Sequence, residues 1–142
     1  MNRSKRFEPI AALAGVRETL AARALAASLK DVKVKETDLD QLRAYLEEYQ
    51  RAAAPGGQAV DSMRLHNAQR FMTRLSDAVR AQEDELRNAK QRYRAEAERW
   101  RASHRHTQAL ERLVDKYYRE ELLELERRNQ TELDELVLRL TR

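Results

Sequence analysis

The stretch Ala54-Pro55-Gly56-Gly57 is the strongest break in this 142-residue sequence. Proline cannot donate a backbone hydrogen bond inside a helix, and two consecutive glycines permit the dihedral angles of a turn. Outside this stretch the chain contains only one other proline and one other glycine. The segments on either side are therefore expected to be long helices that are joined by a turn at about residues 54–59.

The composition favours helix throughout both segments. Charged residues make up 37% of the chain, and the abundant Ala, Leu, Glu, Arg and Gln are good helix formers. We expect an all-α fold in a single domain, residues 1–142, with helix one at about 8–53 and helix two at about 60–140. Pro9 suits the first turn of helix one, and Asp61 suits the N-cap of helix two.

Helix two carries a coiled-coil stripe that advances in alternating steps of three and four residues, and most of its positions are apolar or aromatic. The stripe consists of Leu65, Ala68, Met72, Leu75, Val79, Gln82, Leu86, Ala89, Tyr93, Glu96, Trp100, Ser103, Thr107, Leu110, Val114 and Tyr117. Such a stripe predicts a partner helix along most of the length of helix two.

Helix one offers two sets of apolar residues at seven-residue spacing. One set is Leu13, Leu20, Ala27 and Val34, with Leu42 and Tyr49 close to it; the other is Leu25, Val32, Leu39 and Leu46. A chain that folds back at residues 56–57 would place the first set opposite Trp100, Tyr93, Leu86 and Val79. This match predicts a long two-helix antiparallel coiled-coil hairpin, because short connections favour antiparallel neighbours.

The same fold-back at residues 56–57 leaves helix two without a partner helix after about Glu111. The C-terminal helical overhang would contain some 30 residues, or about 45 Å at 1.5 Å per residue. It carries Leu122, Leu125, Leu133, Leu136 and Leu140. An apolar stripe on a lone helix predicts docking onto another protein surface.

The charge pattern argues against a simple nucleic-acid-binding role. The net charge is +4 and the isoelectric point is about 9.6. However, residues 87–106 are mainly basic and residues 111–136 are mainly acidic. Mixed charge of this kind is typical of a solvated helix face rather than of one continuous phosphate-binding stripe.

Sequence features of enzymes, metal sites and membrane segments are missing. The chain has no cysteine and no phosphate-binding glycine loop. His104 and His106 lie on opposite sides of a helix, so they cannot bind one metal ion there. The apolar stretch from Ile10 to Val16 is too short for a signal peptide or a membrane span. We therefore expect no catalytic residues, no metal and no cofactor.

Aromatic residues gather near the expected turn. Tyr45 and Tyr49 form a ridge with Leu42, and Phe71 forms a second ridge with Leu75 and Ala78. These side chains could cover the helix pair from the side, or they could form an exposed patch of the kind that anchors protein interfaces. The sequence leaves both interpretations open.

Several segments, in their order and spacing, resemble the flagellar FliJ family. They are Arg6-Phe7-Glu8-Pro9-Ile10 with Leu13 and Arg17-Glu18, the ridge Leu42, Tyr45 and Tyr49, Phe71-Met72-Thr73-Arg74-Leu75 with Ala78 and Gln82, Trp100, and Gln130-Thr131-Glu132-Leu133-Asp134-Glu135-Leu136. The similarity extends over nearly the whole chain.

This resemblance implies a non-enzymatic component of the flagellar type III export apparatus. Such a protein is cytoplasmic and peripheral at the inner face of the cell membrane, at the flagellar base. It is similar to the coiled-coil hairpin of the rotary ATPase γ subunit. The implied partners are the export ATPase hexamer, the export-gate membrane protein and export chaperones, with no small-molecule substrate, no nucleic acid and no membrane insertion.

The resemblance also implies two binding sites. The export-gate site would consist of Leu42, Tyr45, Tyr49, Phe71, Leu75, Ala78 and Gln82. The ATPase-ring site would consist of Arg6, Phe7, Leu122, Leu125, Leu133, Leu136 and Leu140. Asp38, an acid where the resemblance leads us to expect an amide, is left out. A stalk of a virulence-type secretion system, another structural coiled coil and a basic nucleic-acid-binding hairpin remain as alternatives.

Overall fold

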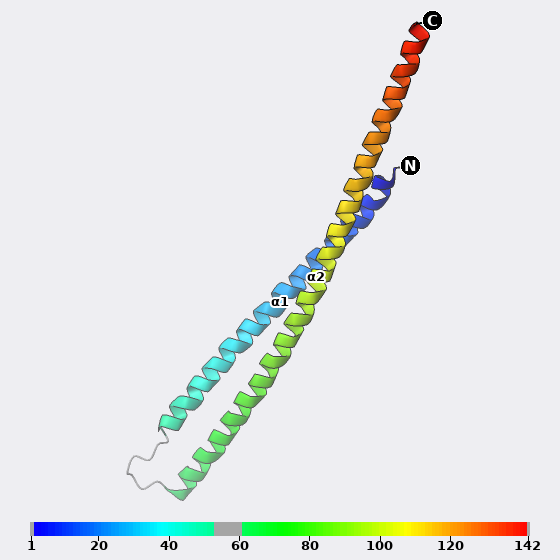
Figure 1. Ribbon diagram of the computed structural model, residues 1–142. Helices are drawn as coiled ribbons and strands as arrows, with labels where there is room; N and C mark the ends of the chain where they lie inside the picture. Colours follow the sequence, from blue (N-terminus) through cyan, green and yellow to red (C-terminus); the bar gives the residue numbers. More distant parts are fainter. Residues whose placement is uncertain (1, 53–60, 142) are drawn as a thin grey trace. The chain divides into compact units, whose positions relative to one another are not determined.

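The computed structural model describes residues 2–52 and 61–141, which form two helices (Figure 1). Helix α1 spans Arg3–Ala52 and helix α2 spans Ser62–Leu140. No strand occurs in the described residues, and the prediction of an all-α fold is confirmed. The break at residues 54–57 lies outside the described residues.

Helix α1 begins at Arg3, earlier than the sequence suggested. Pro9 therefore lies inside the helix, and its placement in the first turn was wrong. Contacts with α2 explain the longer helix, because Ser4 hydrogen-bonds Glu121 and the ring of Phe7 packs on Tyr117. These contacts lie on the N-terminal side of Pro9 and hold the first turns in place.

The start of α2 agrees with the predicted N-cap. The backbone N–H of Met63 donates a hydrogen bond to Oδ1 of Asp61 at 3.3 Å. The carbonyl oxygen of Asp61 accepts the first backbone bond of the helix, from the N–H of Leu65 at 3.0 Å. A side-chain oxygen at this position satisfies a backbone donor that has no partner in the first turn.

The chain divides into two compact units. Unit 1 comprises Met1–Ala22 and Arg99–Arg142, and unit 2 comprises Arg23–Glu98. In each unit a segment of α1 runs antiparallel to a segment of α2 (Figure 1).

The stripe predicted on α2 is the surface that this helix buries. All of its positions from Ala68 to Tyr117 are buried or half-buried, and only Leu65 is exposed. Four of its members, Leu75, Val79, Ala89 and Thr107, are among the most buried residues of the chain. The alternating spacing therefore identified the correct face of α2.

On α1, the second apolar set forms the buried face. In unit 2 this face follows Leu25, Ser28, Val32, Lys35, Leu39, Leu42, Leu46 and Tyr49. In unit 1 it follows Ser4, Phe7, Ala11, Ala14, Glu18 and Ala21. The first set, Leu13, Leu20, Ala27 and Val34, is exposed, so the predicted pairing of these residues with Trp100, Tyr93, Leu86 and Val79 was wrong.

Ion pairs in unit 2 give the observed register. Asp31 lies 3.7 Å from Arg92, whereas a fold at residues 56–57 would place it opposite residue 82. Glu36 pairs with Lys90 at 3.9 Å, and Arg43 pairs with Glu83 at 3.2 Å. Residues 62–67 of α2 are all exposed. The start of α2 is therefore not opposed by the end of α1, and the register predicted from a fold-back at residues 56–57 was wrong.

The overhang of α2 in unit 1 also begins later than predicted. Leu110, Val114 and Tyr117 are half-buried, and Glu121 bonds Ser4. The unpaired segment is thus Leu122–Leu140, which we call the C-terminal overhang and in which every residue is exposed. The predicted boundary at Glu111 was wrong because α1 starts earlier and the register is shifted.

Candidate functional site

Three aromatic side chains meet in unit 2. The ring centroids of Tyr49 and Phe71 lie 4.7 Å apart, and those of Tyr45 and Phe71 lie 6.3 Å apart with the rings almost perpendicular. Both distances are typical of stabilising aromatic contacts. We call Tyr45, Tyr49 and Phe71 the aromatic cluster. Its two tyrosines come from consecutive turns of α1, and its phenylalanine comes from α2.

The aromatic cluster covers the helix pair and also projects from it. Tyr49 is half-buried, whereas Tyr45 is 52% exposed and Phe71 is 39% exposed. Beside it, Leu75 is buried and Ala78 is exposed. The sequence left open whether these residues cover the helix pair or form an exposed patch. Tyr49 covers the helix pair, whereas Tyr45 lies on the surface.

A shallow groove adjoins Tyr45 in the same unit. It has a volume of about 340 Å³ and is lined by Asp38, Gln41, Leu42, Tyr45 and Gln82. The groove brings Gln82 of α2 next to Leu42 and Tyr45 of α1. The structure thus gathers most residues of the predicted export-gate set on one surface of unit 2.

The other predicted set lies in unit 1, and its members differ in accessibility. Phe7 is half-buried, since its ring lies 5.5 Å from that of Tyr117, and the guanidinium of Arg3 lies 5.6 Å from the same tyrosine ring. Arg6 is exposed. Phe7 therefore helps to hold the two helices together, which the sequence did not indicate.

The overhang leucines are the most accessible large apolar residues of this set. Their exposed fractions range from 43% at Leu122 to 78% at Leu140. Asn2, which precedes α1, lines a groove together with Leu122 and Leu125, yet all five leucines remain exposed. Exposed leucines at this density mark a surface that another protein chain can bury.

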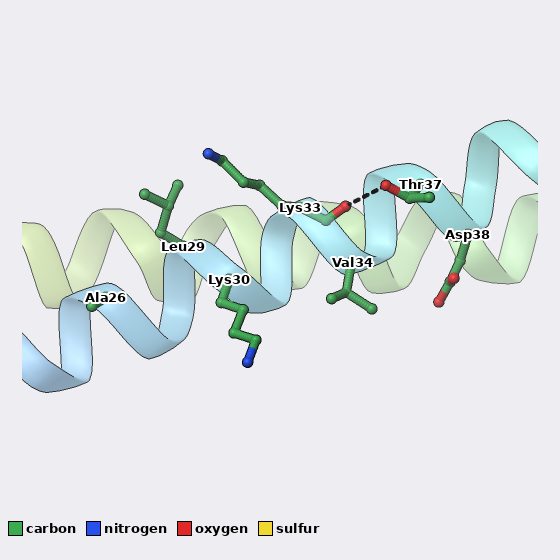
Figure 2. A pocket seen from close by; sticks show the side chains of 7 residues that line it. All are labelled: Ala26, Leu29, Lys30, Lys33, Val34, Thr37 and Asp38. Carbon is green, nitrogen blue, oxygen red and sulfur yellow. Dashed lines mark hydrogen bonds between the residues drawn. The ribbon is translucent and has the colours of Figure 1, made fainter.

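A third exposed surface belongs to α1 alone. A groove in unit 2 is lined by Ala26, Leu29, Lys30, Lys33, Val34, Thr37 and Asp38, with α2 passing behind (Figure 2). The hydroxyl of Thr37 donates a hydrogen bond to the carbonyl oxygen of Lys33 at 3.0 Å. Val34, which the sequence analysis placed opposite Val79 between the two helices, lies in this exposed groove instead.

One protein-family model matches nearly the whole chain and includes both helices. The sequence matches the family described as the flagellar FliJ protein over residues 3–142. The chain belongs to the flagellar FliJ family. A search of curated proteins finds no match to it. The match confirms the resemblance noted from the sequence, and it makes the chain a component of the flagellar export apparatus.

The FliJ family match includes both predicted binding surfaces. It contains the aromatic cluster of unit 2 as well as the first turns of α1 and the C-terminal overhang of unit 1. The family is a structural, non-catalytic export component. Family membership therefore directs attention to contacts with other proteins rather than to chemistry.

A polar cluster in unit 1 of this FliJ-family chain was not predicted from the sequence. Nδ1 of His104 lies 2.5 Å from Oε1 of Glu18, and the His104 ring stacks on Trp100 with centroids 5.1 Å apart. Trp100 is half-buried, as expected, but its predicted partner Leu13 is exposed. The i, i+4 spacing of Trp100 and His104 was the signal that could have revealed the stack.

The described residues were also considered as metal ligands and as membrane-spanning segments, and they provide neither. Over residues 2–52 and 61–141, no three His, Asp or Glu side chains group in a way that could hold a metal ion. Neither helix, where it is described, has a stretch that is apolar and long enough to span a bilayer.

Proposed function

We propose that this FliJ-family chain acts as a stalk between the export ATPase ring and the export gate. The observation that carries the proposal is the C-terminal overhang, where leucines on a single helix are exposed without a partner among the described residues. An isolated helix gains nothing by exposing apolar side chains. A helix that ends in such a stripe is suited to insert into the centre of a ring of subunits.

The ATPase-ring surface would include Leu122, Leu125, Leu133, Leu136 and Leu140, together with Arg6 and Phe7 at the start of α1. Glu120, Glu124, Arg127 and Arg128 surround the leucines as a charged rim. An apolar centre with a polar rim is the usual anatomy of a protein interface. Because Phe7 packs on Tyr117, its contribution would be to hold α1 against α2 beside the overhang.

The export-gate surface would be the aromatic cluster with Leu42, Leu75, Ala78 and Gln82. Tyr45 supports this assignment best, since it is a large exposed aromatic residue beside a groove. Tyrosine is enriched among residues that contribute strongly to binding. Leu75 is buried and would act by supporting Phe71.

Export chaperones would be further partners, and the chain would work in the cytoplasm at the flagellar base. The flagellar family match supports this setting over a virulence-type secretion system or an unrelated coiled coil. The protein performs no chemistry in this proposal. It biases the conformations of neighbouring subunits through differential contact.

ATP hydrolysis by the purified export ATPase tests the proposal. The double variant Leu133→Ser, Leu136→Ser should lose most of the stimulation that the unchanged chain gives, because both leucines lie in the overhang. The matched control is Leu13→Ser, Leu20→Ser, which removes two equally exposed leucines from α1 in the same unit. Full stimulation by the overhang variant, with helicity unchanged, would contradict the proposal.

A further inference from the structure

The exposed stripe at the end of α2 has a symmetric spacing. Seven residues lie on one helix face, separated by steps of 4, 3, 4, 4, 3 and 4: Tyr118, Leu122, Leu125, Asn129, Leu133, Leu136 and Leu140. All seven are exposed. At 3.6 residues per turn they fall within about 40° on either side of the central residue. The order of spacings is the same from either end, with Asn129 in the middle.

Such a stripe is complementary to itself when a second copy lies antiparallel to it. A two-fold axis at Asn129 would place Tyr118 opposite Leu140, Leu122 opposite Leu136, and Leu125 opposite Leu133. Every apolar position then meets an apolar position. A two-fold interface requires the same patch on both chains to be self-complementary, and this stripe meets that requirement.

The one polar position falls on the symmetry axis. Asn129 of one chain would face Asn129 of the second copy, where the two amides can donate to and accept from each other. A single asparagine in an otherwise apolar coiled-coil seam specifies register and the number of strands, at a cost in stability. A polar residue in the centre of the stripe therefore fits a paired seam that must keep one alignment.

Charged residues beside the stripe support the antiparallel alignment. On one flank, Arg128 of each chain would lie near Glu132 of the other, and Arg139 would lie near Glu121. In the single chain, Arg128 pairs with Glu124 of its own helix, at 2.9 Å on an exposed surface. The two Arg128 side chains would also approach each other, so the net gain is modest.

A groove already exists beside the first half of the stripe. It has a volume of about 230 Å³, and its lining includes Tyr118, Leu122, Leu125 and Arg128, together with Asn2, which directly precedes α1. In the antiparallel alignment, Leu136 and Leu140 of the second copy would enter this groove. The groove lies entirely within unit 1.

We propose that residues 118–140 pair with the same segment of a second copy in an antiparallel, two-fold symmetric coiled coil centred on Asn129. The seam is only about 33 Å long at 1.5 Å per residue, so the dimer is weak and reversible. It buries the leucines that the proposed stalk function assigns to the ATPase ring. Self-pairing and ring binding therefore exclude each other, and the dimer shields the overhang until the ring is present.

Cysteine crosslinking tests the geometry, because the chain has no cysteine of its own. Asn129→Cys should form an interchain disulfide with itself under mild oxidation, whereas Thr131→Cys, on the opposite face, should not. Leu122→Cys and Leu136→Cys should each stay uncrosslinked alone but form a mixed disulfide when two differently tagged proteins are combined. Self-crosslinking of each of these variants would instead indicate a parallel dimer and overturn the proposal.

Charge reversal tests the alignment without any cysteine. In sedimentation velocity over about a hundredfold range of concentration, Arg128→Glu and Glu132→Arg should each weaken the dimer about tenfold by placing like charges together. An equal mixture of the two variants should restore the affinity of the unchanged chain. No ATPase is involved, so this outcome is independent of the stalk proposal. A monomer at every concentration, with Asn129→Cys no more reactive than Thr131→Cys, would refute the pairing.

Discussion

Glu121 of α2 accepts two hydrogen bonds from Ser4 of α1. The backbone N–H of Ser4 donates to Oε1 at 3.0 Å, and its hydroxyl donates to Oε2 at 2.6 Å. The pair lies where α1 begins, and it closes the last contact before α2 continues as the overhang. Both hydrogen bonds lower the pKa of the Glu121 carboxyl from its ordinary value of 4.5, and the one from the Ser4 hydroxyl has the larger effect.

This lowered pKa predicts that acid weakens the contact at the start of α1. Because the folded-state pKa lies below the unfolded one, ionised Glu121 stabilises the fold above the unfolded pKa, and this contribution is lost as the pH falls through the folded pKa. Ser4→Ala should therefore lower the melting temperature of unit 1 at neutral pH and lose less stability on acidification. Thr19→Ala is the control, since that hydroxyl donates a hydrogen bond to the carbonyl of Gly15 in its own helix. Identical pH profiles for Ser4→Ala and the unchanged chain would contradict the prediction.

The observed register of unit 2 predicts unequal costs for two similar truncations. Leu39 is 2% exposed, whereas Val34 is 50% exposed. Leu39→Ala should cost about 2–5 kcal/mol of unfolding free energy through lost burial and a residual cavity. Val34→Ala should cost no more than about 0.5 kcal/mol. Urea unfolding followed by circular dichroism measures both, and a larger effect at Val34 would restore the pairing first expected from the sequence.

Close packing at Ala89 predicts that a larger side chain is not tolerated there. Ala89 is 1% exposed, so a leucine in its place must push the two helices apart. We expect Ala89→Leu to destabilise the fold by about 1–3 kcal/mol. Ala95→Leu, on the exposed face of the same helix in the same unit, is the control and should be nearly neutral. Equal stability of the two variants in thermal melts would show that the seam at Ala89 can adapt.

The aromatic cluster predicts separate effects on binding and stability. Tyr45→Ala should weaken binding to the export gate and lower the melting temperature less than Tyr49→Ala does, because Tyr45 is 52% exposed and its ring lies farther from Phe71, at 6.3 Å. Tyr49→Ala should lower the melting temperature, since its ring packs on Phe71 at 4.7 Å. Tyr45→Phe keeps the ring and should keep most of the affinity. Titration of each variant with the purified gate protein gives the comparison, and a large stability loss for Tyr45→Ala would assign that residue to the core.

The sequence predicted the buried face of α2 because its stripe holds one phase from Ala68 to Tyr117. It could not choose between two faces of α1, since Leu25, Val32 and Leu39 are as apolar as Leu13, Leu20 and Val34. The choice depends on pairing, and the seam of α1 contains polar or small residues such as Ser28 and Lys35 that carry little hydrophobic signal. The register between α1 and α2 was predicted incorrectly for a related reason, because a fold-back at residues 56–57 had to be assumed.

The candidate sites were predictable to a similar extent. Spacing along one helix placed Tyr45 beside Tyr49, and the family resemblance linked both to Phe71. Contacts that join residues more than eighty positions apart were not foreseen. Ser4 with Glu121 and Glu18 with His104 are pairs of this kind. Single-sequence periodicity describes one helix at a time and therefore carries no information about such partners.

The chain has one tryptophan, Trp100, and it stacks on His104 within unit 1. Its fluorescence therefore reports on the surroundings of unit 1 alone, while far-ultraviolet circular dichroism reports on both units together. Following one denaturation with both signals separates the melting of the terminal unit from that of the unit that bears the aromatic cluster. Coincident curves would mean that the two units unfold cooperatively, and an earlier fluorescence change would mean that unit 1 can open while unit 2 stays folded.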